Sequence, residues 1–452
     1  MRYVTAPWAA LSAPARGVRV GLLLLMTALV TMIWDQWIMA GASGVLLANT
    51  LLTSDVITKE SMRVLVNNLV FAKTINRTYD SKFKMTGAAA ANGDTIRVRK
   101  PPRYLGRSGM AMVPEAVTET YVNVALQYEW GVDLEVSDWD LALSLDNFSE
   151  KCLKPAAARI ATYIDMKCME KAALSIPYAV GTPGTIPTAL LTYGLAASKL
   201  DDNAAPQDDQ RYMTISSRMQ TYIVDAAKGL FNASAEISKQ YRKGRMGVYG
   251  GFTWQMDQNV YTHTTGAQGG TPLVNGAAQS GTSLITDGWT AAVANRLAVG
   301  DRFTVAGVNH VNPSNYMSTG ELQQEIVTAI GASDVNGNMT ITHSPGFVVS
   351  GSGQTVDALP ANNAAITIAG AASTQTPCGI AHHRDCIALA FADLVVPKGK
   401  DMAGRMSDED LGVSIRFIRD FETRTGQWLT RLDVIFGVAD LRGDSLGCVI
   451  YS

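Results

Sequence analysis

The sequence predicts an α+β fold, and three observations support this prediction. Apolar residues alternate with polar or small ones over 122–136, as in a long strand with one apolar face. Two stretches, 53–76 and 149–175, place apolar residues at helical spacing. Residues 264–376 are rich in Gly, Ala, Thr, Ser and Asn, with short Val/Ile runs between turns, which is typical of a small β domain.

Composition narrows the class of protein. The chain has 452 residues, of which 47% are hydrophobic and 17% charged, so we expect a globular protein of about two to four domains. A net charge of −2 argues against a protein whose main task is wrapping nucleic acid. The five cysteines are odd in number and scattered, which favours reduced thiols in a cytosolic setting.

Residues 1–38 do not fit the rest of the chain. Arg16 and Arg19 precede an apolar run of 15 residues over 20–34, shorter than the roughly 20 of a membrane span. Three interpretations stay open: an upstream extension before a true start at Met39, a signal or anchor, or an N-terminal helix. We favour the first, because the residues from Met39 onward read as a plausible protein start.

Most of the chain after residue 53 reads as an ordered succession of helices and strands. Pro155 is tolerated only in a first turn, so the second helix is expected to be regular from near Lys154. Further helices are predicted over 188–200, 217–231, 233–243 and 384–394. Strands are predicted over 211–216, 247–257, 302–305, 325–330, 339–342, 365–368, 413–417 and 432–438.

The long alternating stretch is the most unusual feature. A strand over 122–136 would be roughly 50 Å long at about 3.3 Å per residue. With the alternating stretch 94–100 and the Pro, Gly and Arg-rich segment between them, it predicts an extended hairpin too long to cover itself. Its apolar face is therefore predicted to lie over a neighbouring subunit. The candidate contact residues on that face are Val122, Val124, Leu126, Tyr128 and Trp130.

The same hairpin carries a basic cluster of Arg97, Arg99, Lys100, Arg103 and Arg107. Such a cluster can contact nucleic acid phosphates. We favour subunit contact or solvated surface, because acidic residues lie on or near the return strand. These residues can pair with the basic cluster within one subunit or between two. These acidic residues are Glu115, Glu119, Glu129, Asp133 and Glu135.

Two short motifs resemble metal sites. Cys378, His382, His383 and Cys386 carry zinc-ligand chemistry, but four ligands within nine residues do not easily close a tetrahedron. The segment 334–338 lacks the spacing of a calcium loop and is predicted to be a turn. Phosphate-loop and dinucleotide motifs do not occur. We therefore predict no catalytic residue, no metal and no cofactor.

Six segments in collinear order resemble the P22-type coat protein family of tailed-phage major capsid proteins. They are ANTLLTSDVITKESMRVLVNNLVF (48–71), GDTIRVRKPPRY (93–104), DNFSEKCLKPAAARIATYID (146–165), QNVYTHTTG (258–266), LAVGDRFTVAGV (297–308) and SIRFIRDFETRTGQWLTRLDVIFGVADLR (414–442). The resemblance implies an HK97-like capsid fold with an inserted small β-barrel. The expected parts are an N-terminal extension (1–38), an N-arm helix (39–92), an extended loop (93–136), a peripheral domain with the spine helix (137–180), an axial domain (181–263), the inserted domain (264–376) and the return strands (377–452).

The resemblance also implies a function. Pentamers and hexamers of the chain would assemble in the bacterial host cytoplasm, with scaffolding and portal proteins, into an icosahedral virion capsid. That capsid would enclose double-stranded DNA through weak non-specific contacts, without a membrane in the mature shell. Three alternatives remain: an encapsulin-like shell, which the segment 264–376 disfavours; an exported β-rich surface protein; and a hydrolase whose site the sequence does not reveal.

Overall fold

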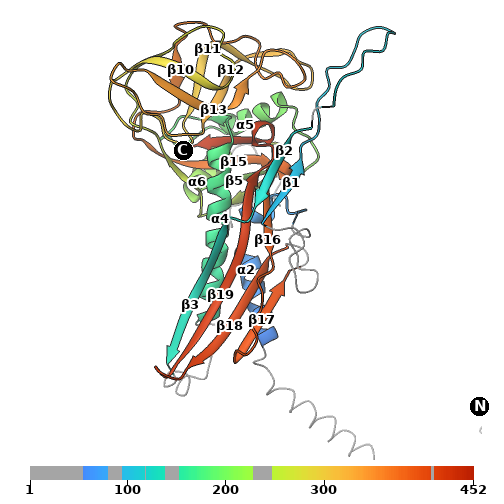
Figure 1. Ribbon diagram of the computed structural model, residues 1–452, viewed down its shortest axis with the longest axis vertical. Helices are drawn as coiled ribbons and strands as arrows, with labels where there is room; N and C mark the ends of the chain where they lie inside the picture. The colour runs from blue at the N-terminus through green and yellow to red at the C-terminus, as the bar shows by residue number, and fades with distance from the viewer. Residues whose placement is uncertain (1–53, 80–93, 118, 138–151, 228–246, 409–411) are drawn as a thin grey trace, which may run out of the picture. The chain divides into compact units, whose positions relative to one another are not determined.

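The structure, a computed structural model, describes residues 54–79, 94–117, 119–137, 152–227, 247–408 and 412–452 (Figure 1). The chain divides into two units after Ile57, and of the first unit only the start of helix α2 (Ser54–Asn68) is described. Everything below concerns the second unit. Its described elements mix helices with three larger sheets and one hairpin, so the α+β prediction is confirmed.

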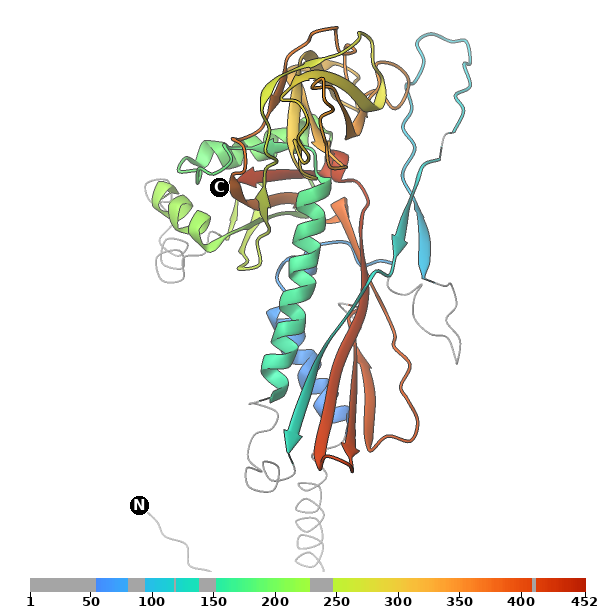
Figure 2. The same cartoon turned by 60° about the vertical axis from the view of Figure 1, so that its left-hand side comes forward.

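A five-stranded sheet packs against the long helix α4 (Lys154–Ser175), which runs alongside it (Figure 2). Half of the buried residues of α4 are alanines, and these small side chains allow a close approach to the sheet. Pro155 stands in the first turn, as predicted. The strands are β3 (Tyr128–Ser137), β16 (Ile387–Ala392), β17 (Met402–Ser407), β18 (Ser414–Glu422) and β19 (Gln427–Asp440).

A mixed seven-stranded sheet is built from segments far apart in the sequence. Helices α5 (Leu190–Asp202) and α6 (Ser217–Ala227) belong to the same region. The predicted strand at 211–216 and the predicted helix at 188–200 are present with slightly different ends, and the predicted helix at 217–231 is described as far as Ala227. The strands are β4 (Ala179–Val180), β5 (Arg211–Ile215), β6 (Val248–Tyr249), β7 (Phe252–Met256), β8 (Thr262–Thr264), β15 (Gln375–His383) and β20 (Gly447–Tyr451).

A six-stranded sheet lies within 264–376 and closes on itself. Its two end strands, β9 (Gly270–Val274) and β14 (Ile366–Ile368), are joined by a bridge between Leu273 and Ala365 and a hydrogen bond from Val274 N to Ala364 O at 3.0 Å. A buried cluster around Leu284, Phe303 and Phe347 fills its interior. We call this sheet the barrel; its other strands are β10 (Gly281–Trp289), β11 (Arg302–Val311), β12 (Ser318–Val327) and β13 (Met339–Phe347).

The prediction of one continuous strand over 122–136 is wrong. β2 (Tyr121–Ala125) pairs with β1 (Thr95–Arg99), whereas β3 pairs with β19. The chain changes partner at residues 126–127, where Leu126 N donates to Asp94 O and Gln127 N donates to Phe436 O. It crosses so close to Gly437 that a Cβ there would lie 2.0 Å from Ala125 O. Because alternation continues through the crossing, the sequence pattern does not reveal it.

The prediction of a helix over 384–394 is also wrong. The segment forms a short 3-10 turn, η5 (Arg384–Cys386), followed by strand β16. A fully buried apolar run has no distinguishing periodicity, so pattern alone does not separate a helix from a strand here. β16 pairs with β19 on one side, and on the other Asn76 N donates to Ile387 O. The predicted helix over 233–243 lies outside the described residues.

Arg302 of β11 fixes the barrel to the end of α4. Its fully buried guanidinium donates to Ala173 O at 2.7 Å and to Ile176 O at 2.6 Å, the carbonyls left open where the helix ends. It also donates to the Tyr451 hydroxyl at 3.0 Å. A cation at the negative end of a helix is favourable, and here it comes from a segment far along the chain.

A buried carboxylate holds the segment that follows α2. Asp165 of α4 accepts hydrogen bonds from Val70 N at 2.7 Å and Ala72 N at 2.8 Å, at the start of the 3-10 helix η2 (Phe71–Lys73). Burial raises the pKa of the Asp165 carboxyl to about 7, and nearby Asp257 adds to the rise. Asp165 is therefore easily protonated near neutral pH in the folded chain.

We expect Arg302→Met to lower the free energy of unfolding of the unassembled subunit by about 2–4 kcal/mol, because buried carbonyls lose their charged donor. Chemical denaturation followed by circular dichroism measures this. The control is Arg424→Met, whose side chain is 88% exposed, with an expected change within about 0.5 kcal/mol. Equal stability of the Arg302 and Arg424 variants would contradict the capping role.

We expect Asp165→Asn to change how stability depends on pH. The folded carboxyl has its pKa raised to about 7, so between roughly pH 4 and pH 7 the folded state binds more protons than the unfolded chain, and stability falls as pH rises. Relative to the variant, the wild type should gain up to about 1.4 kcal/mol per pH unit on acidification from pH 7 to pH 5.

Denaturation at several pH values measures this difference. Asp420→Asn is the control, because the hydrogen bond from Lys400 lowers the pKa of Asp420 and its titration lies below this window. Parallel stability curves for the wild type and Asp165→Asn would contradict the prediction.

Candidate subunit-contact surface

Residues 100–120, which we call the arm, connect β1 to β2 and project from them (Figure 2). At the base, Lys100 N donates to Thr120 O at 2.8 Å. Farther out, the Glu115 carboxylate accepts the N–H groups of Leu105 and Gly106 at 3.0 and 2.8 Å and so joins the two sides. The arm is thus an ordered loop held partly by side chains.

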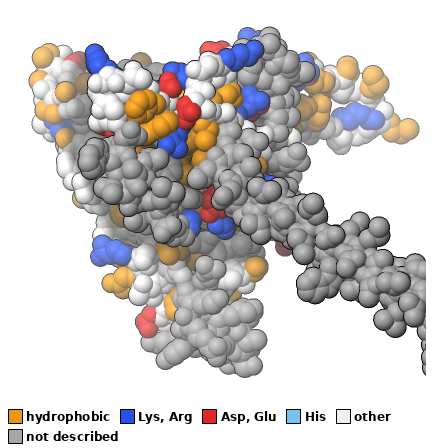
Figure 3. Space-filling view, turned by 90° about the horizontal axis from the view of Figure 1, so that it is seen from below, with side chains coloured by type: hydrophobic (Ala, Val, Ile, Leu, Met, Phe, Trp, Pro, Cys, Tyr) orange, Lys and Arg blue, Asp and Glu red, His pale blue; other side chains and the backbone are white. Residues whose placement is uncertain are grey.

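The arm carries a run of uncovered apolar side chains. Met110 is 98% exposed and Met112 81% exposed, and hydrophobic side chains lie beside a basic one at the projecting end (Figure 3). Exposed apolar groups that are contiguous along one segment indicate a contact with another protein. The other exposed apolar residues of the arm are Tyr104, Leu105, Val113 and Val117.

The five basic candidates do not form one patch. Arg97 and Arg99 point outward from β1, where Arg97 lies over the Tyr121 ring at 5.0 Å and Arg99 pairs with Glu119 at 3.2 Å. Arg107 donates to Gly109 O within the arm. Lys100 and Arg103 instead line a cavity at the arm's base. An exposed pair such as Arg99 and Glu119 contributes little stability.

The apolar face of 122–136 packs against its own chain, and of its five candidate residues only Val124 is buried, while the other four are half-buried. Val124 is fully buried among Ile96, Val98 and alanines of β16. Trp130 stacks on Tyr163 of α4 with ring centroids 3.9 Å apart. Tyr128 packs beside Phe436 at 5.3 Å. Val122 and Leu126 are half-buried against the same cluster, and a role for them in a subunit contact stays a prediction.

The acidic residues of β3 pair mainly within their own sheet. Arg431 of β19 lies 3.5 Å from Glu129, 3.8 Å from Asp133 and 2.9 Å from Asp433. Three carboxylates thus share one arginine, while the Glu135 carboxylate accepts a hydrogen bond from Gln427. The only predicted acidic partner that forms an ion pair with the basic cluster among the described residues is Glu119.

Neither metal-like motif forms a metal site. Cys378 and His382 lie on β15, where His382 packs against Phe71 and His383 contacts the Asp208 carboxylate at 3.0 Å. Burial lowers the pKa of His382 to about 3, so it stays neutral. Within the described ranges no group of three or more His, Cys, Asp or Glu residues is placed to hold a metal ion. In those ranges no helix is long and apolar enough to cross a membrane.

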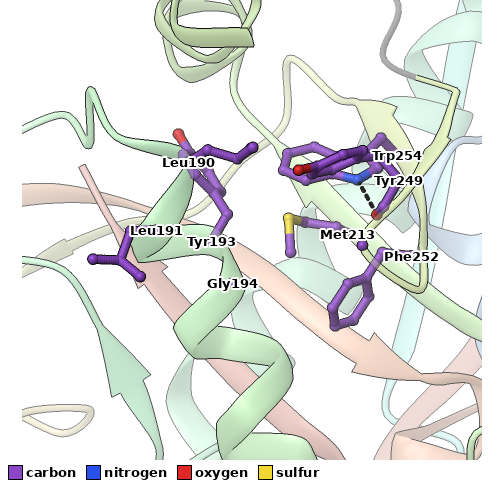
Figure 4. Close-up of a pocket in the computed structure, with 9 residues that line it drawn as sticks. Leu190, Leu191, Tyr193, Gly194, Met213, Tyr249, Phe252 and Trp254 are labelled. Atoms are coloured by element: carbon purple, nitrogen blue, oxygen red, sulfur yellow. Dashed lines mark hydrogen bonds between the residues drawn. The ribbon is translucent and has the colours of Figure 1, made fainter. Parts of the chain in front are cut away.

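An apolar pocket of about 270 Å³ lies between α5 and strands β6 and β7 (Figure 4). Tyr193, Met213 and Phe252 lie along its walls, and the indole N–H of Trp254 donates to Tyr249 O at 2.9 Å. Leu191 at its rim is 73% exposed. The lining supplies no carboxylate, imidazole or thiol, so the pocket suits apolar packing rather than chemistry.

Sequence reasoning missed the contact between the arm and the barrel. The Tyr316 hydroxyl, in the turn between β11 and β12, donates to Tyr104 O at 3.2 Å and to Ser352 O at 3.4 Å. Tyr104 and Tyr316 are 212 positions apart, and one polar contact between two loops leaves no periodic signal. The arm is therefore braced near its base by another part of the same chain.

Comparison with known proteins gives one broad match. The family model described as P22 coat protein, gene protein 5, matches residues 47–451. No curated protein matches the chain.

Several solved structures are similar. They include one described as Mycobacterium phage Che8 (11% identity, 84% of this chain and 90% of that chain covered, TM-score 0.43). Others are the capsid of Ralstonia phage GP4 (8%, 85% and 88%, 0.44) and a virus-like particle from Pyrococcus furiosus (6%, 88% and 98%, 0.35). These TM-scores are too low for the likenesses to carry an argument. The assignment of the chain to a family rests on the family model that matches residues 47–451.

We expect Val124→Asp to destabilise the isolated subunit by about 3–5 kcal/mol, because it places a carboxylate in a sealed apolar cluster. Val117→Asp is the matched control, since Val117 is 59% exposed on the arm, and its stability should change by less than about 0.5 kcal/mol. Chemical denaturation separates the two. A folded Val124→Asp subunit of wild-type stability would show that this face is not internal.

Proposed function

Because the chain belongs to the P22 coat protein family, and is thus a phage major capsid protein, we propose that its pentamers and hexamers form an icosahedral virion head around double-stranded DNA. The resemblance ties this family to the HK97-like shell fold. The role proposed for the chain is structural and not catalytic. An encapsulin-like shell is not favoured by the family match.

The observation that supports assembly most directly is the exposed apolar arm. A segment with Met110 and Met112 almost fully in water is unfavourable in an isolated subunit. Head-to-tail contacts around a closed ring allow every arm to be covered by the next copy. We propose that the arm end is the contact, together with Arg97, Arg99 and Arg107, while the covered residues Val124 and Trp130 support it from within.

Other parts of the proposal rest on the family. Scaffolding and portal proteins as assembly partners, weak DNA contact and assembly in the host cytoplasm are carried over from the resemblance. The net charge of −2 fits a weak rather than a tight DNA contact. The boundaries expected for the inserted domain, 264–376, enclose the barrel strands, and we propose them as its limits.

The exported surface protein is the second candidate function, and it has less support. It rests on the apolar run 20–34, which lies outside both the described residues and the matched residues. Mass spectrometry of N-terminal peptides from the native protein tests whether residues before Met39 are present.

We expect the double variant Met110→Asp, Met112→Asp to fold normally and to form few or no shells, because two carboxylates would have to be buried in the contact. The full chain and residues 39–452 are expressed with and without a scaffolding protein. Sedimentation velocity and negative-stain microscopy give the fraction assembled.

Met110→Leu, Met112→Leu is the control, because it keeps apolar volume and should assemble like the wild type. Normal assembly of the aspartate variant would remove the arm end from the contact. Persistent folded monomers of the wild type under every condition would count against the shell itself.

A further inference from the structure

A cavity of about 580 Å³ lies at the base of the arm, between β1 and β2, the barrel loop around Ser352 and the short helix α8 (Gly443–Leu446). Three cationic side chains line it: Lys100, Arg103 and Arg442. One carboxylate, that of Asp444, also lines it, with Lys100 Nζ at 4.0 Å. The cavity wall therefore carries more positive than negative charge.

Neither arginine has a hydrogen-bond acceptor among the residues that the structure describes. Among the described residues, the guanidinium groups of Arg103 and Arg442 make no hydrogen bond or ion pair, although both side chains are half-buried. The nearby Asp385 carboxylate already accepts the Asn76 amide at 2.6 Å. A guanidinium group that has lost part of its hydration without gaining an acceptor is unfavourable. A bound anion would supply the missing acceptors for both arginines.

The two arginines also repel each other. Burial lowers the pKa of the Arg442 guanidinium, Asp444 opposes this, and the positive charge of Arg103 lowers it further. Both side chains line the same cavity, so their like charges act on each other. An anion between the two guanidinium groups would attract both of them and offset this repulsion.

The backbone on which both side chains stand is held in place before any ligand arrives. Pro101 and Pro102 restrict the chain ahead of Arg103, and Tyr104 O beyond it is held by the Tyr316 hydroxyl at 3.2 Å. On the other side, the N–H groups of Leu441 and Arg442 both donate to Cys386 O at 3.0 Å. Such prior ordering lowers the entropy cost of binding.

The geometry points to an oxyanion-binding site in this cavity, in which Arg103 and Arg442 hold one multidentate oxyanion between them. The planar guanidinium fork matches carboxylate and phosphate oxygens alike. Two sources supply that chemistry, free inorganic phosphate and a carboxylate side chain of a neighbouring copy. The second source rests on the proposed assembly, whereas the site itself does not.

Isothermal titration of the unassembled full-length subunit with inorganic phosphate, against chloride at equal ionic strength, tests the site. We expect one phosphate per subunit, with the dissociation constant raised about tenfold or more in Arg103→Gln and in Arg442→Gln. Arg424→Gln is the control, because the Arg424 side chain is 88% exposed and does not line the cavity. Its phosphate affinity should be that of the wild type.

Arg442→Lys keeps the charge but loses the planar fork, so its phosphate affinity should lie between those of the wild type and Arg442→Gln. It replaces Arg442→Gln in the test if that variant does not fold. Absence of phosphate binding by the wild type, or equal binding by the wild type and both cavity variants, overturns the site.

Titration of assembled shells separates the two sources. Phosphate binding that persists in the shell identifies a free anion, and binding that disappears on assembly identifies a neighbour's carboxylate. If no shell forms in any condition, the proposed function fails. The oxyanion site is still decided separately, by phosphate titration of the unassembled subunit.

Discussion

The buried guanidinium of Arg302 is the interaction on which the placement of the larger parts depends. It comes from the first residue of β11, reaches the last carbonyls of α4 and meets the hydroxyl of Tyr451 on β20. Its acceptors are neutral oxygens, so the charge is stabilised by the helix end and not by a buried acid. If the barrel shifted against α4, the Arg302 guanidinium would lose its hydrogen-bond acceptors. The contact therefore favours one position of the barrel on α4.

A polar network continues from that joint into the barrel. Gln324 accepts Ala179 N at 2.7 Å and donates to Ala179 O at 3.0 Å, so it pairs with the chain just beyond α4. His310 contacts the Gln323 amide oxygen at 2.7 Å, and Glu325 contacts His343 at 2.8 Å deeper inside. Burial raises the pKa of the Glu325 carboxyl to about 7. The barrel is thus attached through directional polar contacts that leave few alternative orientations.

Sequence reasoning succeeded where one element buries one face. The helix from Lys154 and the alternating strands of the barrel, such as β10 and β13, each keep a period that a single face dictates. It failed where the partner changes or burial is complete. Alternation over 122–136 continues through a change of sheet at Gly437, and the run IALAFA of β16 is apolar on both faces. Arg302, Asp165 and Tyr316 act through contacts across the fold, which no local spacing encodes.

Because the alternating face packs within its own chain, the subunit contact that we propose lies on a different segment. Alternation correctly identified an apolar face but not what packs on it, since Val124 is buried against β16 and the half-buried Trp130 stacks on Tyr163 of α4 in the same chain. The uncovered apolar groups lie instead on the irregular arm, where no period exists to draw attention to them. The arm is braced by Tyr316 of the barrel, and the barrel is fixed to α4 by Arg302. A continuous chain of contacts therefore links the spine of the fold to the surface that we propose as the subunit contact, so the direction of the arm is tied to the position of the barrel.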